Sequence, residues 1–299
     1  MCGVRVGGHS AVTGSLVERV RRRVGRAAAV LVGRDVADAP PAVAPAPVET
    51  VDRSADQWFW DHYEWAPTEV LGFLREDGLD VEGLEVADVG CGDGIIDLGL
   101  VHHGKPARLV GFDVNPVRDD LLLERAVAAH VADALPSALE FAVSDTTKLP
   151  APDDSFDVVV TWSAFEHIDD PATVLTEIRR VLRPDGVFFL QLWPFYHSQH
   201  GAHLEEWYPD GYVQFQQDAD AIEADVLARA EDEGWARYKL GEYRTLNEIT
   251  VDELGHAVEA AGFRITKLQL ISQRAQLPPD VAGMDLSRLG VSGIMLLAR

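Results

Sequence analysis

Cysteine is almost absent from this sequence, which has Cys2 and Cys91 and no others in 299 residues. Two cysteines do not make a disulfide framework, and so low a content is typical of a reducing compartment. Apolar runs of the roughly 18 residues that span a membrane are also lacking. The first ten residues have neither the apolar core nor the cleavage pattern of a signal peptide. We therefore expect a cytoplasmic protein.

Positive charge is scarce as well, with 26 Lys and Arg against 49 Asp and Glu and a net charge of −23. This balance argues against a broad nucleic-acid surface. Residues 1–50 are the exception, because seven arginines against four acids give this segment a net charge of +3. We predict that residues 1–50 are a basic arm ending in a Pro/Ala linker, and that 51–299 form the main domain. Helical spacing over 15–31 leaves weak membrane or partner contact open.

From residue 84 onward, short apolar runs alternate with helical patterns. This alternation is typical of an α/β domain with a parallel sheet. Two later apolar runs favour a final antiparallel pair, and Thr250 with Glu253 forms a capping box for a helix over 251–261. The sequence thus predicts a doubly wound, mostly parallel seven-stranded sheet, with strands at 84–89, 107–113, 139–143, 156–161, 187–192, 263–271 and 291–298.

Two segments depart from this alternation. Residues 193–247 are rich in Trp, Tyr, His and acids, and we interpret them as a substrate lid inserted after the fifth strand, with a helix at 218–231. Residues 58–65 gather five aromatic side chains. That cluster is either a short helix packed on the core or a flap over a bound ligand.

The first strand runs into a turn with three alternating glycines, Gly90, Gly92 and Gly94, preceded by Asp88. Glycine allows a tight turn and a close approach of the backbone to a ligand, and the free N–H groups of a following helix point to the same place. The dinucleotide fingerprint requires a further glycine where this chain has Ile95. A nicotinamide dehydrogenase is therefore disfavoured.

With these residues the chain resembles the class I S-adenosylmethionine-dependent methyltransferases over about residues 55–299, outside the insertion. Further motifs carry the resemblance, namely Gly111-Phe112-Asp113 and the segments 143–150, 156–167 and 180–187. It implies a Rossmann-like methyltransferase fold and S-adenosyl-L-methionine as the cofactor.

The resemblance also implies a role for each acidic residue. Asp88 would face the ammonium of the cofactor's methionine part, Asp113 both ribose hydroxyls, and Asp145 the adenine amino group. Two adjacent O–H donors suit one carboxylate. The predicted cofactor-binding residues are Asp88, Gly90, Cys91, Gly92, Asp113, Val114, Asp145, Thr146, Thr161 and Trp162.

Candidate catalytic residues lie after the fourth strand and in the insertion. We favour His203 as a general base, with His167 as a second candidate. The three-residue steps of His197, His200 and His203, with Glu205 nearby, resemble metal-ligand spacing, but we predict no metal site. An aromatic wall for the acceptor is expected from Trp193, Tyr196, Trp207 and Tyr208.

The predicted function is in-line transfer of the cofactor's methyl group to a small-molecule or glycan-like acceptor. Two alternatives stay open. One is a protein or RNA methyltransferase recruited through the basic arm, and the other is a non-catalytic protein that binds S-adenosylmethionine. The acceptor atom and the oligomeric state are not fixed by the sequence.

Overall fold

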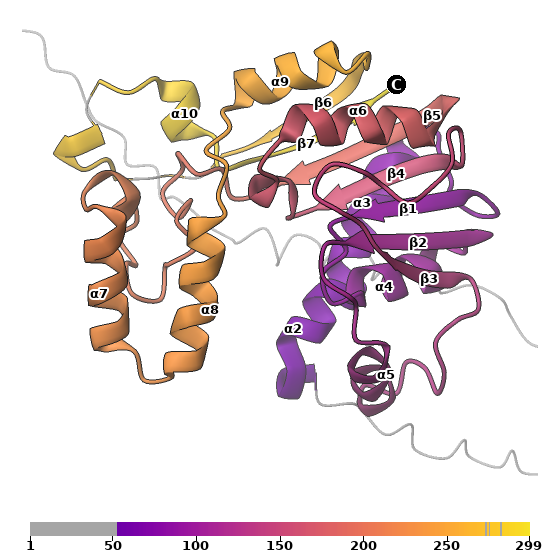
Figure 1. Ribbon diagram of the computed structural model, residues 1–299, viewed down its shortest axis with the longest axis horizontal. Coiled ribbons are helices and arrows are strands. Elements are labelled where there is room, and N and C mark those ends of the chain that lie inside the picture. Colours follow the sequence, from indigo (N-terminus) through magenta and orange to yellow (C-terminus); the bar gives the residue numbers. More distant parts are fainter. Residues whose placement is uncertain (1–52, 273, 275, 282) are drawn as a thin grey trace, which may run out of the picture. The chain divides into compact units, whose positions relative to one another are not determined.

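The computed structural model describes residues 53–299 apart from 273, 275 and 282, and these residues belong to one unit, Val51–Arg299 (Figure 1). The predicted basic arm and linker over 1–50 lie outside the described residues. Among the described helices, none is both long and apolar enough to cross a membrane.

A seven-stranded sheet organises this unit, with the strand order β3-β2-β1-β4-β5-β7-β6 (Figure 1). The first five strands in this order pair in parallel, whereas β7 runs antiparallel to both β5 and β6. The predicted fold, including its antiparallel final pair, is confirmed. The strands are β1 (Glu85–Val89), β2 (Arg108–Asp113), β3 (Leu139–Val143), β4 (Phe156–Trp162), β5 (Leu182–Leu192), β6 (Ile265–Ile271) and β7 (Gly293–Ala298).

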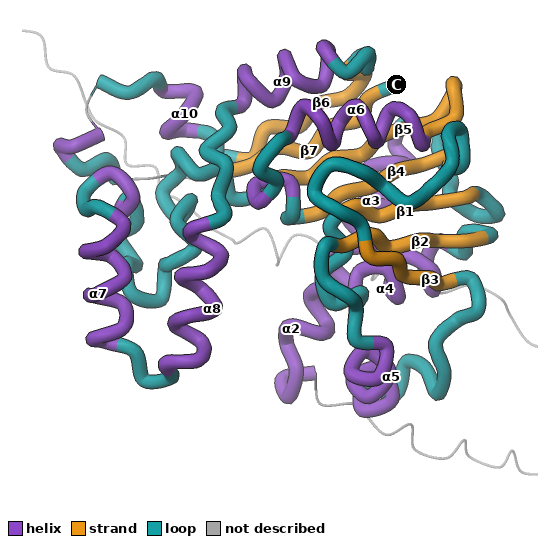
Figure 2. Tube along the Cα trace, in the orientation of Figure 1, coloured by secondary structure: helices purple, strands orange, loops and turns teal. Residues whose placement is uncertain are grey.

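Helices cover both faces of the sheet because the central strands are apolar on both sides. On β5, Phe188 faces one hydrophobic cluster together with α6 (Pro171–Val181) and α9 (Val251–Ala260). The next residue, Phe189, faces the opposite cluster with α3 (Ala66–Glu76) and α4 (Ile95–Gly104). This alternation follows from the two-residue period of a strand. Figure 2 shows the strands in orange between the purple helices.

The remaining helices follow the expected pattern with some differences. The aromatic segment forms α2 (Gln57–Trp60) and a π-helical turn over Asp61–Trp65, and α5 spans Asp119–Ala128. A short α10 (Leu286–Gly290) was not predicted. Strand β5 begins at Leu182, five residues earlier than expected, and a register shift against β4 between Phe156 and Val158 accommodates the extra residues.

The insertion over 193–247 carries two helices, α7 (Ala219–Arg229) and α8 (Glu233–Arg244), which lie side by side (Figure 1). Residues of both helices and of the preceding loop form a small hydrophobic cluster apart from the sheet. We expected α7 but not α8, because α8 is rich in charged residues and buries few side chains. Asp232 before α8 was the available signal, since its carboxylate accepts from the Gly234 and Trp235 amides.

The predicted capping box at the start of α9 is present. The Thr250 hydroxyl accepts from the Glu253 amide at 3.2 Å, and the Glu253 carboxylate accepts from the Thr250 amide at 2.9 Å. We predict that Thr250→Ala lowers the free energy of unfolding by about 1 kcal/mol, because the amide N–H of Glu253 loses its side-chain acceptor at the start of the helix. Urea denaturation measures this effect. Thr250→Ser keeps the hydroxyl and should unfold like the wild type; equal stability of the Ala variant would contradict the prediction.

Candidate active site

The loop between β1 and α4 turns on its three glycines, whose φ angles are 85° at Gly90, 57° at Gly92 and 77° at Gly94. All three lie in the left-handed region that glycine tolerates. A Cβ on Gly90 would lie 2.4 Å from the Cβ of Ala164, whereas one on Gly92 would meet no atom within 4 Å. The loop is therefore packed tightly on one side and open on the other.

Asp113 connects this loop to the end of β2. One of its carboxylate oxygens accepts from the Gly92 amide at 3.0 Å, and the other accepts from the Asn115 amide at 2.8 Å. Both oxygens keep further lone pairs for a ligand. The carboxylate is held in place at the carboxyl edge of the sheet, where ligands of open α/β sheets bind.

Two buried carboxyl groups lie beneath the glycine loop. Asp88 on β1 is 1% exposed and Asp97 on α4 is 0% exposed. Burial raises the pKa of Asp88 to about 7. Burial, and after it the charge of Asp88, raises the pKa of Asp97 well above its usual range. A Cβ on Gly111 would lie 2.3 Å from Asp97 Oδ2, so this glycine makes room for the pair. Two carboxyl groups buried this close disfavour ionisation of both, which agrees with the raised pKa values.

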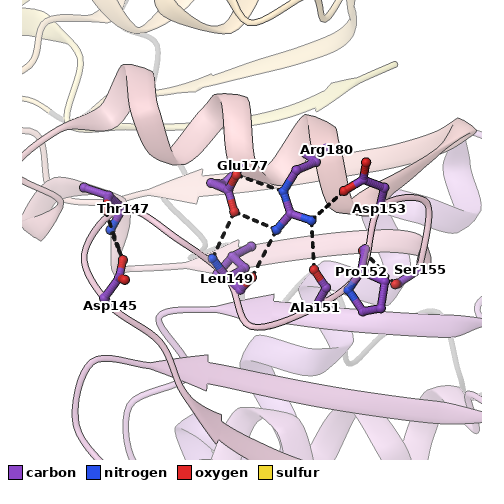
Figure 3. Close-up of polar contacts among 9 residues, drawn as sticks. All are labelled: Asp145, Thr147, Leu149, Ala151, Pro152, Asp153, Ser155, Glu177 and Arg180. Atoms are coloured by element: carbon purple, nitrogen blue, oxygen red, sulfur yellow. Dashed lines mark hydrogen bonds and ion pairs between the residues drawn. The ribbon is translucent and has the colours of Figure 1, made fainter.

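The loop after β3 is tied to α6 through Arg180 (Figure 3). Its guanidinium donates to the carbonyls of Leu149 and Ala151 and to the carboxylates of Glu177 and Asp153, at distances of 2.7 to 3.0 Å. The Leu149 amide also donates to Glu177, at 3.1 Å. All five N–H groups of the arginine are thereby used. This network fixes the loop that carries Asp145 and Thr146.

Asp145 shapes that loop and also faces outward. Its Oδ1 accepts from the amide of Thr147 at 2.8 Å and from the hydroxyl at 3.1 Å, which lowers the pKa of the carboxyl (Figure 3). The carboxylate is exposed and lines the cleft. Asp145 is thus a turn former that stays accessible to a ligand.

The candidate catalytic histidines lie together. His167 ends a 3-10 turn after β4, His203 comes from the insertion, and their ring centroids are 5.3 Å apart. Burial is the first cause that lowers the pKa of His203, to about 3, so its imidazole is neutral. Glu166 is 3% exposed, and burial raises its pKa to about 8.

A single cleft of about 2180 Å³ joins these groups. Asp88 and Thr161 are buried and are not among the residues that line the cleft. Their predicted direct contact with the cofactor therefore has no support from the cleft lining. Of the predicted residues, the cleft is lined by Gly90, Cys91, Gly92, Asp113, Val114, Asp145, Thr146, Trp162, His167 and His203.

Only one of the four aromatic residues expected to form a wall for the acceptor lines the cleft. Trp193 lines the cleft, whereas Trp207 and Tyr208 belong to the cluster between α7 and α8. Tyr196 packs beside Phe215 and is not among the lining residues.

The segment 58–65 packs on the core, which is one of its two expected roles, and the flap over a ligand stays a prediction. Phe59 and Tyr63 are buried in a hydrophobic cluster with α4 and α5. Trp58 and Trp65 line the cleft, and the Trp58 indole N–H donates to Asp93 on the glycine loop at 3.1 Å. The sequence analysis missed other lining residues, Lys239 and Glu242, because they belong to the unpredicted α8.

This strand order, with its glycine loop and the acidic residues at the carboxyl edge, defines a Rossmann-like domain of the kind that binds S-adenosylmethionine. Residues 87–190 match a family model described as a methyltransferase domain. Over residues 87–190 the chain is a methyltransferase domain, as predicted from its resemblance to the class I S-adenosylmethionine-dependent methyltransferases. The predicted enzyme class and cofactor agree with the names of the relatives.

Curated relatives share part of the chain. A ubiquinone biosynthesis O-methyltransferase of Hahella chejuensis is 31% identical over 158 residues, which cover 48% of this chain and 62% of that protein. A sterol 24-C-methyltransferase of Aspergillus fumigatus is 38% identical over 112 residues, 38% of this chain and 28% of that protein. The chain spans less than two thirds of the length of these relatives.

Among solved structures, a putative methyltransferase of Bacillus halodurans superposes with a TM-score of 0.49 and 16% identity, covering 77% of this chain and 98% of that one. The fold assignment here depends on the strand order and the family match instead.

The buried carboxyl pair predicts a pH-dependent stability. The pKa of Asp88 rises from 3.8 in the unfolded chain to about 7 in the fold. The folded protein therefore holds a proton that the unfolded chain releases, and this contribution to stability is lost as the pH rises from about 4 to 7. Asp97→Asn supplies a neutral donor to Asp88. Between about pH 5 and 7 the free energy of unfolding of Asp97→Asn should fall by about 1 kcal/mol less than that of the wild type, or by a larger margin.

Urea denaturation of both proteins at several pH values measures the difference. The exposed Asp133→Asn is a matched control that should keep the wild-type slope. Parallel pH profiles for wild type and Asp97→Asn would show that the Asp97 carboxyl does not contribute to the pH dependence of stability.

Proposed function

We propose that this protein transfers the methyl group of S-adenosylmethionine to a small-molecule acceptor. The observation that carries the proposal is the single cleft, which is lined at one end by the glycine loop, Asp113 and Asp145 and at the other by the histidines and the insertion. Its volume of about 2180 Å³ exceeds the roughly 300–1,000 Å³ of pockets for a single ligand, which leaves room for a cofactor and an acceptor together.

The residues present fit the cofactor. The open side of the glycine loop at Gly92 admits the methionine part without a Cβ in the way. The two oxygens of Asp113 are placed to accept from the ribose hydroxyls. The exposed carboxylate of Asp145, which lines the cleft, would accept from the adenine amino group. Since Asp88 does not line the cleft, it would act on the ammonium through a water or through the loop backbone.

When bound, the cofactor supplies a methyl group that its sulfonium already makes electrophilic. The chain's task is to orient the acceptor and to exclude water, and orientation alone is worth up to about 7–11 kcal/mol. Trp65 and Trp162 meet edge to face at 5.5 Å and both line the cleft. Gln191 accepts from the Ser163 amide at 2.8 Å and from its hydroxyl at 3.0 Å, and so fixes the end of β4 beside them.

A hydroxyl or amine acceptor also has to lose a proton. His203 suits this role because its buried imidazole is neutral and its Nε2 has no partner among the described residues. His167 lies beside it as the second candidate.

An apolar or aromatic acceptor is favoured over a glycan. Side chains of Trp193, Ile271 and Met295 line the acceptor end of the cleft. The names of the relatives point the same way, since they refer to ubiquinone biosynthesis and to sterols. Oxygen and carbon are the acceptor atoms that these names give for those proteins.

We predict that Asp113→Ala weakens the binding of S-adenosylmethionine by about 10- to 150-fold. Hydrogen bonds to a charged group contribute roughly 1.5–3 kcal/mol, and 1.4 kcal/mol corresponds to a tenfold change. Isothermal titration calorimetry measures the affinity. Asp133→Ala, an exposed aspartate away from the cleft, is the control and should bind like the wild type. Wild-type affinity in Asp113→Ala would refute the ribose assignment.

We predict that His203→Ala lowers turnover by roughly 10²- to 10⁴-fold, the usual contribution of positioned proton transfer. Its affinity for S-adenosylmethionine should stay within a few-fold of wild type, because His203 lies at the acceptor end of the cleft. Product formation with the methyl-labelled cofactor and a panel of phenolic and sterol-like acceptors measures turnover. Undiminished turnover would exclude His203 from the reaction.

A further inference from the structure

Glu166, His167 and His203 bring three potential metal ligands together. One carboxylate oxygen and two imidazole nitrogens lie within 4.8 Å of one another. Two of the residues come from the turn after β4 and the third comes from the insertion. This is not the set of histidines that the sequence spacing pointed to, because His197 stacks on Phe215 instead.

The hydrogen bonds around His167 fix which of its nitrogens is free. The Thr245 hydroxyl donates its only proton to the Glu242 carbonyl at 2.9 Å. The contact of 2.8 Å between Thr245 Oγ1 and His167 Nδ1 therefore has the imidazole as donor. His167 Nε2 is left unprotonated, which is the form that binds a metal.

The other two side chains have buried polar atoms that lack partners. Both carboxylate oxygens of Glu166 and Nε2 of His203 are buried, and none has a hydrogen-bond partner in the part of the chain that the structure describes. A buried carboxylate without a partner is costly, and it is retained where it is paired or bound to a metal. These atoms lie in the same cluster as His167 Nε2.

We propose that Glu166, His167 and His203 bind a divalent transition-metal ion such as Zn²⁺. Two imidazoles and one carboxylate are a donor set that zinc sites use when they keep a position open for substrate. A tetrahedral ion with bonds of about 2.1 Å separates its ligands by about 3.4 Å. The ligand atoms of the cluster reach this geometry by moving together by roughly an ångström.

The surroundings hold the ligands in place. Asn247, at the end of the insertion, donates its amide N–H to the Glu166 carbonyl at 2.8 Å. Its side-chain amide donates to the carbonyls of Phe165 and Ile168 at 2.8 and 2.9 Å. Lys239 is ion-paired with Glu242, so these two charges cancel beside the imidazoles. Because burial raises the pKa of Glu166 to about 8, a bound cation would displace the proton of this carboxyl and leave one negative charge facing the ion.

This inference deepens the proposed function and rests on it for its chemistry. The cluster lines the acceptor end of the cleft. An ion there would bind a hydroxyl or enolate oxygen of the acceptor and orient it. His203 would then be a ligand in place of a general base. The ion would lower the pKa of the acceptor hydroxyl, and the proton would leave to solvent water.

Zinc binding to the full-length protein tests the proposal without any turnover. The protein, free of affinity tag and stripped with a chelator, is titrated with Zn²⁺ by calorimetry, and retained zinc is measured after gel filtration. We expect one site. Loss of an outer-shell partner costs about 10- to 100-fold in metal affinity, so Glu166→Gln and His203→Ala should each weaken binding by at least about 100-fold. The outer-shell variant Thr245→Val should weaken it by about tenfold or more.

Matched controls are Glu259→Gln and His256→Ala, which change exposed residues of α9 and should bind zinc like the wild type. Circular dichroism establishes that each variant is folded. Absence of a zinc site in the wild type, or equal affinity in Glu166→Gln and Glu259→Gln, would overturn the proposal. Calorimetry with S-adenosylmethionine on the same proteins separates the two ideas, since failure to bind this cofactor would refute the proposed function and leave the zinc result standing.

Discussion

One carboxylate, that of Asp113, holds the cofactor end of the cleft together. It joins the end of β2 to the glycine loop after β1 by accepting the Gly92 amide, and it fixes the chain that follows through Asn115. Parallel strands bring their carboxyl ends to one edge of the sheet, so the segments that meet here come from distant parts of the sequence. The loop after β3, anchored by Arg180, completes this edge. The loops at this edge of the sheet are thus held in place by hydrogen bonds between backbone groups and the side chains of Asp113 and Arg180.

The sequence analysis predicted the sheet well because each strand is a short apolar run bounded by turn residues. It also located α9 from a capping box, a pattern that is local in sequence. Most of the predicted cofactor residues line the cleft for the same reason, since each follows directly from the end of a strand. Local patterns were sufficient wherever the structure is set by local geometry.

The rest depended on contacts between distant residues. Nothing in the spacing indicates that Asp97 lies against Asp88 under the loop, or that Glu166 is buried with its oxygens facing His203. Helix α8 has a charged surface and little hydrophobic periodicity, so its lining residues Lys239 and Glu242 were missed. The lining of the cleft around the histidines therefore comes from the structure rather than from motifs.

The two helices of the insertion stabilise one another through a cluster of their own rather than through the sheet. Substitutions on α8 can then change the part of the cleft that this helix lines while the seven strands and their loops keep their packing. Under the proposed function, a transferase with this architecture can acquire new acceptors by exchange of one inserted segment, while the residues around the methyl donor stay unchanged.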